Sequence, residues 1–250
     1  NFSMSNDVFD VYDNINFSNL KGRFDFVNTE IRYLQSMPDI IKIKGEAKIE
    51  NSQIVFDITS GESNNLLIRN GFVKLYDLNS DFEKANVNLN IVSKNKDLIK
   101  YLDTSPINKK SYAKVRDIIG DVSINLDLDF PLILDLPLEN LKYKASVKTN
   151  NSLLGNLIQD INLNQFSLEI NIDNSEVLYK GKGNIFGSET TFEGKQNFVN
   201  EEFVDEINGK LNISSNLAKF LFPNFEFDYN GEILLSYVIS ENNKGFSKIE

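Results

Sequence analysis

The sequence contains no cysteine, no histidine and no tryptophan among its 250 residues. Without cysteine there is no disulfide and no thiol chemistry, and the redox compartment cannot be inferred from sulfur. Without histidine or cysteine, Ser-His-Asp and Cys-His catalytic arrangements are excluded, and a zinc site would need carboxylates alone. The lack of tryptophan weakens a sugar-binding interpretation. We therefore expect no enzymatic activity, no cofactor and no metal.

Long apolar runs are also missing. No stretch approaches the ~20 apolar residues that a membrane-spanning helix needs. The chain opens with NFSMSNDVFD, which lacks the basic and then apolar pattern of a signal peptide. It ends just after a predicted hairpin. We interpret it as a segment of a longer protein, in which case missing targeting signals say nothing about where the whole protein is located.

The charge balance is acidic, with a net charge of −10. This sign disfavours nucleic acid as a general partner. Charged residues make up 25% of the chain and hydrophobic residues 41%, a balance typical of folded globular proteins rather than disordered ones. The length suits one large β domain or two smaller ones.

The strongest positive signal is alternation of apolar and polar residues. In DVSINLDLDF, residues 121–130, one parity is apolar and the other is polar. A strand with this pattern has one apolar face and one polar face. The same alternation recurs at residues 41–49, 53–58, 87–91, 141–147, 166–172 and 225–240. Asn51-Ser52 and Asn230-Gly231 are predicted hairpin turns.

Helical spacing is rare and short. The candidate helices are residues 96–103, 108–120, 151–160 and 215–222. Several follow a strand directly, and LNIVSKNKDLIKYLDTSP resembles LNISSNLAKFLFP as a strand, a short helix and a later proline. This order suggests a structural repeat. Possible internal units are therefore about residues 20–120 and 121–250.

Several of these stretches resemble AsmA-like proteins of the YhdP/TamB type. In residues 22–61, Tyr33 and Pro38 precede a strand with Gly45, and QIVFDI supplies the partner strand of a hairpin. Downstream, LNIVSKNKDLIKYLDTSPI resembles the strand, short helix and Ser-Pro step of the family, and IIGDVSINLDLDFPL resembles its glycine-led strand. The similarity covers about residues 20–190 and includes no catalytic motif.

The resemblance implies an all-β fold, in which a long, curled, mostly antiparallel sheet with a few short helices forms an open, repeating β-groove. It also implies non-enzymatic transport of phospholipid between the inner and outer membranes, by a periplasmic protein anchored in the inner membrane of a Gram-negative envelope. The expected partners are phospholipid acyl chains, and membranes reached through other parts of the full-length protein. The residues that we expect to line the groove are Ile43, Ala47, Ile49, Val87, Leu89, Ile91, Val122, Ile124, Leu126, Leu128, Phe130, Tyr143, Val147, Phe166, Leu168 and Ile170.

Alternatives remain open at this point. Periodicity alone favours an ordinary sandwich core for the apolar parity, so the alternative function is a structural or adhesive β-sandwich module of a large envelope protein. Residues 94–116 contain seven basic and two acidic residues, a local charge of +5. We expect Lys109, Lys110 and Lys114 to form a solvated face or a basic rim that meets lipid headgroups. Asp127 and Asp129 share one face and could be a catalytic acid pair, although acids on a polar parity are ordinary.

Overall fold

The computed structural model describes most of the chain, and the chain forms two compact units. The described residues are 2–4, 20–33, 37–105, 115–133, 136–158, 161–197, 205–221, 223–224, 233–241 and 247–249. The first unit comprises Asn1–Ser93, Asp97–Ile107 and Ser123–Ala145, and the second comprises Lys94–Lys96, Asn108–Val122 and Ser146–Glu250. The expected repeat of units at about 20–120 and 121–250 stays a prediction, because compactness alone does not test a repeat.

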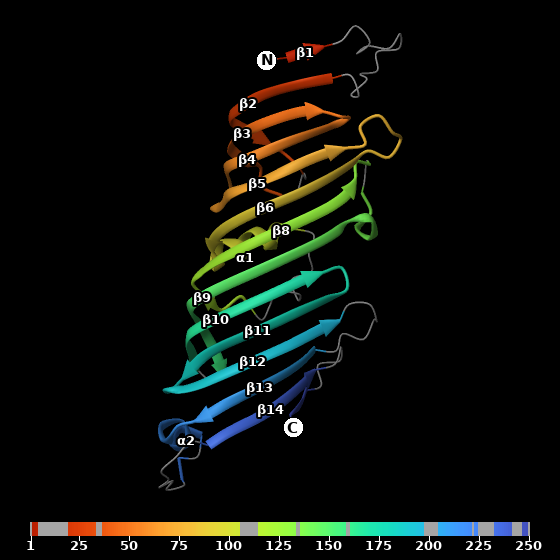
Figure 1. Ribbon diagram of the computed structural model, residues 1–250. Coiled ribbons are helices and arrows are strands. Elements are labelled where there is room, and N and C mark those ends of the chain that lie inside the picture. The colour runs from red at the N-terminus through yellow and green to blue at the C-terminus, as the bar shows by residue number, and fades with distance from the viewer. Residues whose placement is uncertain are drawn as a thin grey trace. The chain divides into compact units, whose positions relative to one another are not determined.

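The first unit is a sheet in which strands pair almost in chain order (Figure 1). The strands from β1 to β6 pair as successive antiparallel neighbours. β8 lies beside β6 in the sheet, and β9 lies beside β8. Most of β8 and the first residues of β9 belong to the first unit. The bounds are β1 (Phe2–Met4), β2 (Leu20–Ile31), β3 (Ile40–Glu50), β4 (Gln53–Ser63), β5 (Leu66–Tyr76), β6 (Lys84–Lys94), β8 (Asp121–Pro131) and β9 (Lys142–Ile158).

The second unit continues the same kind of pairing. From β9 onward the order is β10-β11-β12-β13-β14-β15, with the short β7 pairing with β9 at its far end. The successive pairs from β10 to β15 are antiparallel, as is the pairing of β7 with β9. The bounds are β7 (Ile118–Ile119), β10 (Ile161–Asp173), β11 (Glu176–Ile185), β12 (Ser188–Asn197), β13 (Asp205–Ile213), β14 (Ile233–Glu241) and β15 (Ser247–Ile249).

Tight turns explain why consecutive strands pair. Asn51 and Ser52 both have positive φ, of 53° and 58°, between β3 and β4. The pairs Asn64-Asn65 and Phe186-Gly187 close two further hairpins in the same way. A two-residue turn with φ above zero at both positions matches the right-handed twist of the strands, and asparagine and glycine tolerate that conformation best. The hairpin predicted at Asn51-Ser52 is therefore confirmed.

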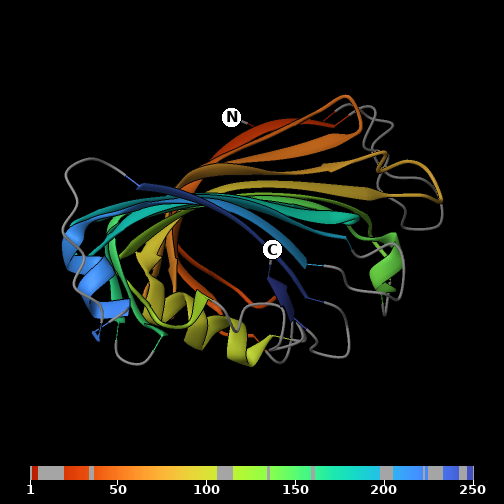
Figure 2. The same cartoon turned by 90° about the horizontal axis from the view of Figure 1, so that it is seen from below.

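In the part of the chain that the structure describes, two short α-helices accompany the sheet. α1 (Asn95–Thr104) and α2 (Ser215–Leu221) confirm two of the four predicted helices. From Asp97 onward, α1 belongs to the first unit, and Figure 2 shows it on one face of the sheet there. A 3-10 turn at Leu138–Asn140 precedes β9.

The helix predicted at residues 151–160 is wrong, because β9 runs without a break to Ile158. Leu153 and Leu154 pair with Ile119 and Ile118 of β7, and Leu154 packs against a buried cluster around Phe166. Ladder hydrogen bonds and core packing therefore override the local helical spacing. Of the helix predicted at 108–120, residues 108–114 lie outside the described residues, and Ile118–Ile119 is a strand. The turn predicted at Asn230-Gly231 also lies outside them.

The all-β fold with a long antiparallel sheet and short helices is confirmed, but the expected curl is not. In neither unit does the order of strands return to its first strand, so neither unit is closed, and neither is strongly curled. The ladders contain local irregularities, such as those between Phe26 and Thr29 on β2 and between Asn164 and Ser167 on β10. An extra residue at such a point bends the strand without closing the sheet.

Candidate functional site: the apolar face of each unit

The first unit carries an apolar face that continues from β2 to β6. Register partners on neighbouring strands form cross-strand rows, and three such rows lie next to one another on this face. The rows are Gly22–Ile49–Ile54–Leu75–Ala85, Phe24–Ala47–Phe56–Val73–Val87 and Phe26–Gly45–Ile58–Gly71–Leu89. Because successive side chains alternate between the two faces, each row collects the apolar parity of five strands.

Burial on this face is graded rather than complete. Ile43 is 2% exposed and Ala47 is fully buried. Around Ile43, the partly buried side chains of Phe26, Val73 and Val87 pack against the buried ones. All the described strands belong to one sheet, so among them no second sheet covers this face. The side chains therefore shield one another, while the outer atoms of the partly buried ones stay accessible.

β8 extends the same face. The side chain of Asn88 on β6 donates to the Asp127 carboxylate at 3.2 Å, so Asp127 lies on the polar face of the sheet. The neighbouring positions Leu126 and Leu128 therefore point to the apolar face, where both are partly buried. The alternating residues 121–130 thus contribute to the apolar face, which no second sheet covers among the described strands.

The acid pair Asp127 and Asp129 has a structural environment on the polar face. Asp127 accepts from Asn88, and Asp129 accepts a hydrogen bond from the Tyr76 hydroxyl at 2.9 Å. Burial, followed by this hydrogen bond, raises the pKa of Tyr76 above its ordinary value. Asn90 on the same face of β6 donates to Asn70. These acids are therefore partners of a polar cross-strand network, and they do not converge on a pocket.

The second unit has an apolar face of the same construction. One row runs Ile170–Tyr179–Gly194–Ile207–Ile239, and the next runs Leu168–Gly181–Phe192–Gly209–Tyr237. At one side, Phe166 is 1% exposed and packs with Ile118, Leu163 and Leu168. The Phe166 and Phe192 rings stack with centroids 6.2 Å apart.

Glycine and aromatic residues face each other across neighbouring strands on both apolar faces, in one pair in the first unit and three pairs in the second. The register partners are Phe26–Gly45 in the first unit and Gly181–Phe192, Tyr179–Gly194 and Gly209–Tyr237 in the second. A Cβ added to any of these glycines would lie only 2.1–2.5 Å from the partner's ring carbon. Each ring thus occupies the space above a glycine, the arrangement known as aromatic rescue. The rings therefore lie along the surface of the sheet and do not project from its apolar face.

Sequence reasoning missed these pairs. The ladder between β11 and β12 is regular at Gly181 and Gly183, and Gly183 accommodates the side chain of Leu163. A search for glycine opposite an aromatic residue across a hairpin that turns at Phe186-Gly187 could have found the Gly181–Phe192 and Tyr179–Gly194 pairs.

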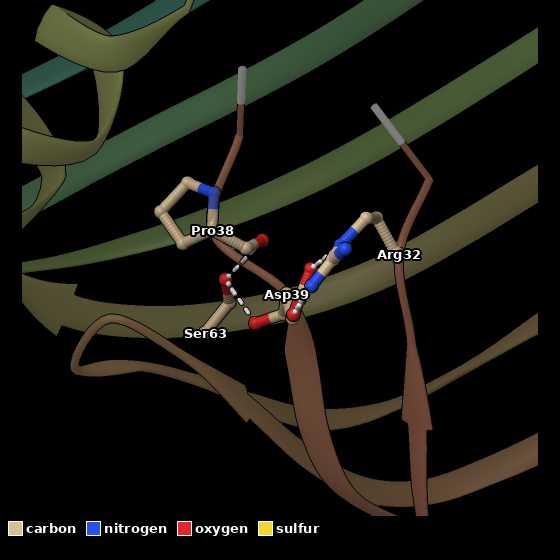
Figure 3. Close-up of polar contacts among 4 residues, drawn as sticks. All are labelled: Arg32, Pro38, Asp39 and Ser63. Carbon is tan, nitrogen blue, oxygen red and sulfur yellow. Dashed lines mark hydrogen bonds and ion pairs between the residues drawn. The ribbon is translucent and has the colours of Figure 1, made fainter. Parts of the chain in front are cut away.

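Pro38 of the Tyr33, Pro38 and Gly45 motif takes part in polar contacts between the end of β2 and the start of β3. Arg32 makes a bidentate pair with Asp39, with Nε and a terminal nitrogen donating to the two carboxylate oxygens at 2.9 and 2.8 Å (Figure 3). The Ser63 hydroxyl lies between the backbone carbonyls of Pro38 and Asp39. These contacts hold the start of β3 against β2 and β4, within the first unit.

Replacing Arg32 should raise the pKa of Asp39. The hydrogen bonds and charge of Arg32 hold the Asp39 pKa below its ordinary value. In Arg32→Gln we expect it to rise towards the ordinary value of an aspartate, as measured by carbon-detected NMR titration. Because the folded-state pKa is lowered, the pair stabilises the fold above the ordinary pKa, and this contribution is lost as the pH falls through the folded-state value. Arg69→Gln, at an exposed arginine on β5, is the control and should leave Asp39 unchanged. An ordinary Asp39 pKa in the unmodified chain would contradict the prediction.

The structure places the predicted groove residues as follows. Buried residues are Ile43, Ala47, Ile49, Leu89, Val122, Phe166 and Leu168; partly buried ones are Val87, Ile91, Ile124, Leu126, Leu128, Phe130, Tyr143, Val147 and Ile170. The role of these residues in lipid binding stays a prediction. The partly buried residues provide most of the surface that solvent or a ligand can reach. The predicted basic rim of Lys109, Lys110 and Lys114 lies outside the described residues.

Two further properties bear on the chemistry. Across the described stretches, acidic side chains form no group of three that could hold a metal ion. None of the helices in that part of the chain is long and apolar enough to cross a membrane.

Comparison with known proteins gives one match. Residues 8–248 match the sequence model of a family described as YhdP protein, which covers nearly the whole chain. No curated protein and no solved structure matches the chain significantly. The resemblance to AsmA-like proteins is thereby confirmed, and the match extends past residue 190, where the sequence motifs become indistinct. The chain therefore belongs to the YhdP family of AsmA-like envelope proteins.

Proposed function

We propose that this chain is a stretch of a lipid-conducting surface, on which the apolar face of the sheet solvates the acyl chains of phospholipids. The observation that supports this most directly is the continuous, only partly buried apolar face of each unit. Family membership supports it further, because YhdP is an envelope protein of the AsmA-like type. The proposed activity is non-enzymatic and uses no cofactor.

The dimensions of the strands suit an acyl chain. Strands β3, β4, β5 and β6 each have 11 residues. At ~3.3 Å per residue, such a strand spans ~36 Å. One leaflet of acyl chains occupies about half of a ~30 Å hydrocarbon core, so one strand is long enough to lie beneath a lipid tail. Headgroups would remain at the edge of the face or in water.

The energetics also favour a ligand on this face. Apolar patches above a few hundred Å² are rare on soluble monomers and mark binding surfaces. Each CH₂ group transferred from water to such a surface contributes ~0.8 kcal/mol. Exposed apolar residues remain within the first unit's face, where Phe24 is 42% exposed. A bound lipid would remove this surface from water.

The proposed setting is the periplasm, with the full-length protein anchored in the inner membrane and lipid moving between the inner and outer membranes. The partners are phospholipid acyl chains, and membranes reached through parts outside this chain. The net charge of −10 makes nucleic acid an unsuitable partner.

Native mass spectrometry followed by lipid extraction tests the function, and two matched variants sharpen the test. Leu126→Asp places a carboxylate on the apolar face, whereas Asn125→Asp places the same group on the opposite face of the same strand. An unpaired charge against hydrocarbon costs ~2.5–3.5 kcal/mol, so lipid bound to Leu126→Asp should fall at least about tenfold. The lipid content of Asn125→Asp should be unchanged.

The measurement distinguishes the proposed function from its alternative. If the unmodified chain, purified gently, carries no lipid and remains monodisperse, a structural module of the envelope protein becomes the better description. Equal loss of lipid in both variants would show that the face of Leu126 is not the binding surface. Circular dichroism of both variants establishes that the sheet is intact.

A further inference from the structure

The polar face of the second unit has a hollow of ≈ 770 Å³ formed by neighbouring strands from β9 to β14. Its lining includes four lysines and two glutamates, a local excess of positive charge in a chain whose net charge is −10. The hollow lies on the side of the sheet opposite the apolar face, since its charged side chains have the parity opposite to that of Gly181 and Phe192.

A single cross-strand row crosses the hollow and alternates hydroxyl and ammonium groups. Its register partners are Ser167, Lys182, Thr191, Lys210 and Ser236. Lys182 and Lys210 are both direct neighbours of Thr191, on the strands to either side of β12. With strands ~4.8 Å apart, the two lysine backbones lie ~10 Å apart, within the combined reach of their flexible side chains.

The lysines of the hollow fall into two kinds. Lys148 and Lys180 both pair with Glu169, at 3.1 and 3.2 Å, and this lowers the Glu169 pKa. By contrast, Lys182 and Lys210 form no ion pair with the described part of the chain. The hydroxyl of Thr191 between them likewise donates to no described side chain. Two uncompensated cations thus flank a hydroxyl group that has no described partner.

We propose that Lys182, Thr191 and Lys210 form a binding site for a phosphate-type anion on the polar face of the second unit. The two ammonium groups approach the anion from opposite sides, and the Thr191 hydroxyl donates from the sheet beneath it. Hydrogen bonds from charged donors to phosphate oxygens are short and strong. Glu193 lies two residues along β12 on the same face and opposes the anion by its like charge. The site is independent of lipid binding on the apolar face.

The first experiment titrates the 250-residue chain with inorganic phosphate and follows backbone amide shifts by NMR. We expect saturable shifts at Lys182, Thr191 and Lys210 that weaken as salt is added, because salt screens exposed charges. Lys182→Gln/Lys210→Gln should weaken binding at least about tenfold. Glu193→Gln should tighten it by about two- to fivefold, because one repulsive charge is removed.

The control is Lys142→Gln/Lys144→Gln, which removes the same charge from two exposed lysines outside the hollow. It should bind phosphate as the unmodified chain does. Undiminished binding by the Lys182→Gln/Lys210→Gln variant, or equal loss in the control, would overturn the proposal.

A second arm identifies the source of the phosphate group. Vesicles of phosphatidylcholine, with and without phosphatidylglycerol, are mixed with the chain and sedimented. Phosphatidylglycerol-dependent sedimentation that is lost in Lys182→Gln/Lys210→Gln would identify a lipid headgroup, and binding of inorganic phosphate alone would identify a soluble anion. If the chain binds neither phosphatidylglycerol vesicles nor inorganic phosphate, the proposed site is refuted. Lipid binding to the apolar face does not depend on these lysines, and Leu126→Asp tests it separately.

Discussion

Replacing Phe166 with alanine should lower the free energy of unfolding of the second unit by ~3–5 kcal/mol. The side chain is 1% exposed, and it contacts a buried cluster that includes Ile118 and Leu163. Its ring also stacks on Phe192, at an interplanar angle of 13°. Truncation removes this contact area and leaves a cavity that the rigid ladders on both sides cannot close.

Urea unfolding followed by circular dichroism measures the loss, and amide hydrogen exchange on β10 and β11 assigns it to the second unit. The matched control is Phe82→Ala, because Phe82 is 75% exposed in the turn between β5 and β6. That variant should change stability by less than ~0.5 kcal/mol. If both phenylalanine variants unfold at the same urea concentration, Phe166 is not a core residue in solution.

Replacing Gly45 with alanine should destabilise the first unit by ~2–3 kcal/mol. The added Cβ would lie 2.1 Å from the backbone oxygen of Asp57 and 2.5 Å from the Phe26 ring. A ring edge can move aside, but a backbone carbonyl inside an antiparallel ladder cannot do so without disturbing its hydrogen bonds. The ladder between β3 and β4 would therefore have to shift.

Gly155→Ala is the corresponding control, since the nearest atom to its added Cβ lies at an ordinary distance of 3.7 Å. Alanine also restricts the unfolded chain more than glycine does, so this variant should be neutral or slightly stabilising. Thermal unfolding of the two variants gives the comparison. A Gly45→Ala protein as stable as Gly155→Ala would show that the backbone carbonyl of Asp57 does not approach Gly45 this closely.

The glycine positions connect stability with the proposed function. On each apolar face, a ring that lies over a glycine contributes apolar area without projecting from the sheet. If acyl chains occupy this face, the same substitutions that strain the ladder would also make its surface uneven. Gly181→Ala is informative here, because the three atoms nearest to its added Cβ all belong to the Phe192 ring. We expect it to disturb lipid binding more than stability.

Much of the fold follows from local sequence. Period-two alternation assigns Leu126 and Leu128 to one face and Asp127 to the other, since successive side chains on a strand must point in opposite directions. The Asn51-Ser52 turn and the helix at Asn95–Thr104 are likewise local, because turn and helix geometry depends on neighbouring residues. The absence of cysteine and histidine excludes their chemistries whatever the fold.

Tertiary structure alone decided the rest, because register joins residues far apart in the chain. Residues 151–158 have helical spacing but form a strand, since pairing with Ile118–Ile119 satisfies their backbone and buries Leu154. The pairing of strands and its register also place Tyr237 over Gly209. In the same way, they place Thr191 between Lys182 and Lys210. Local alternation therefore defines the two faces of each strand, whereas the ladders define which side chains meet on them.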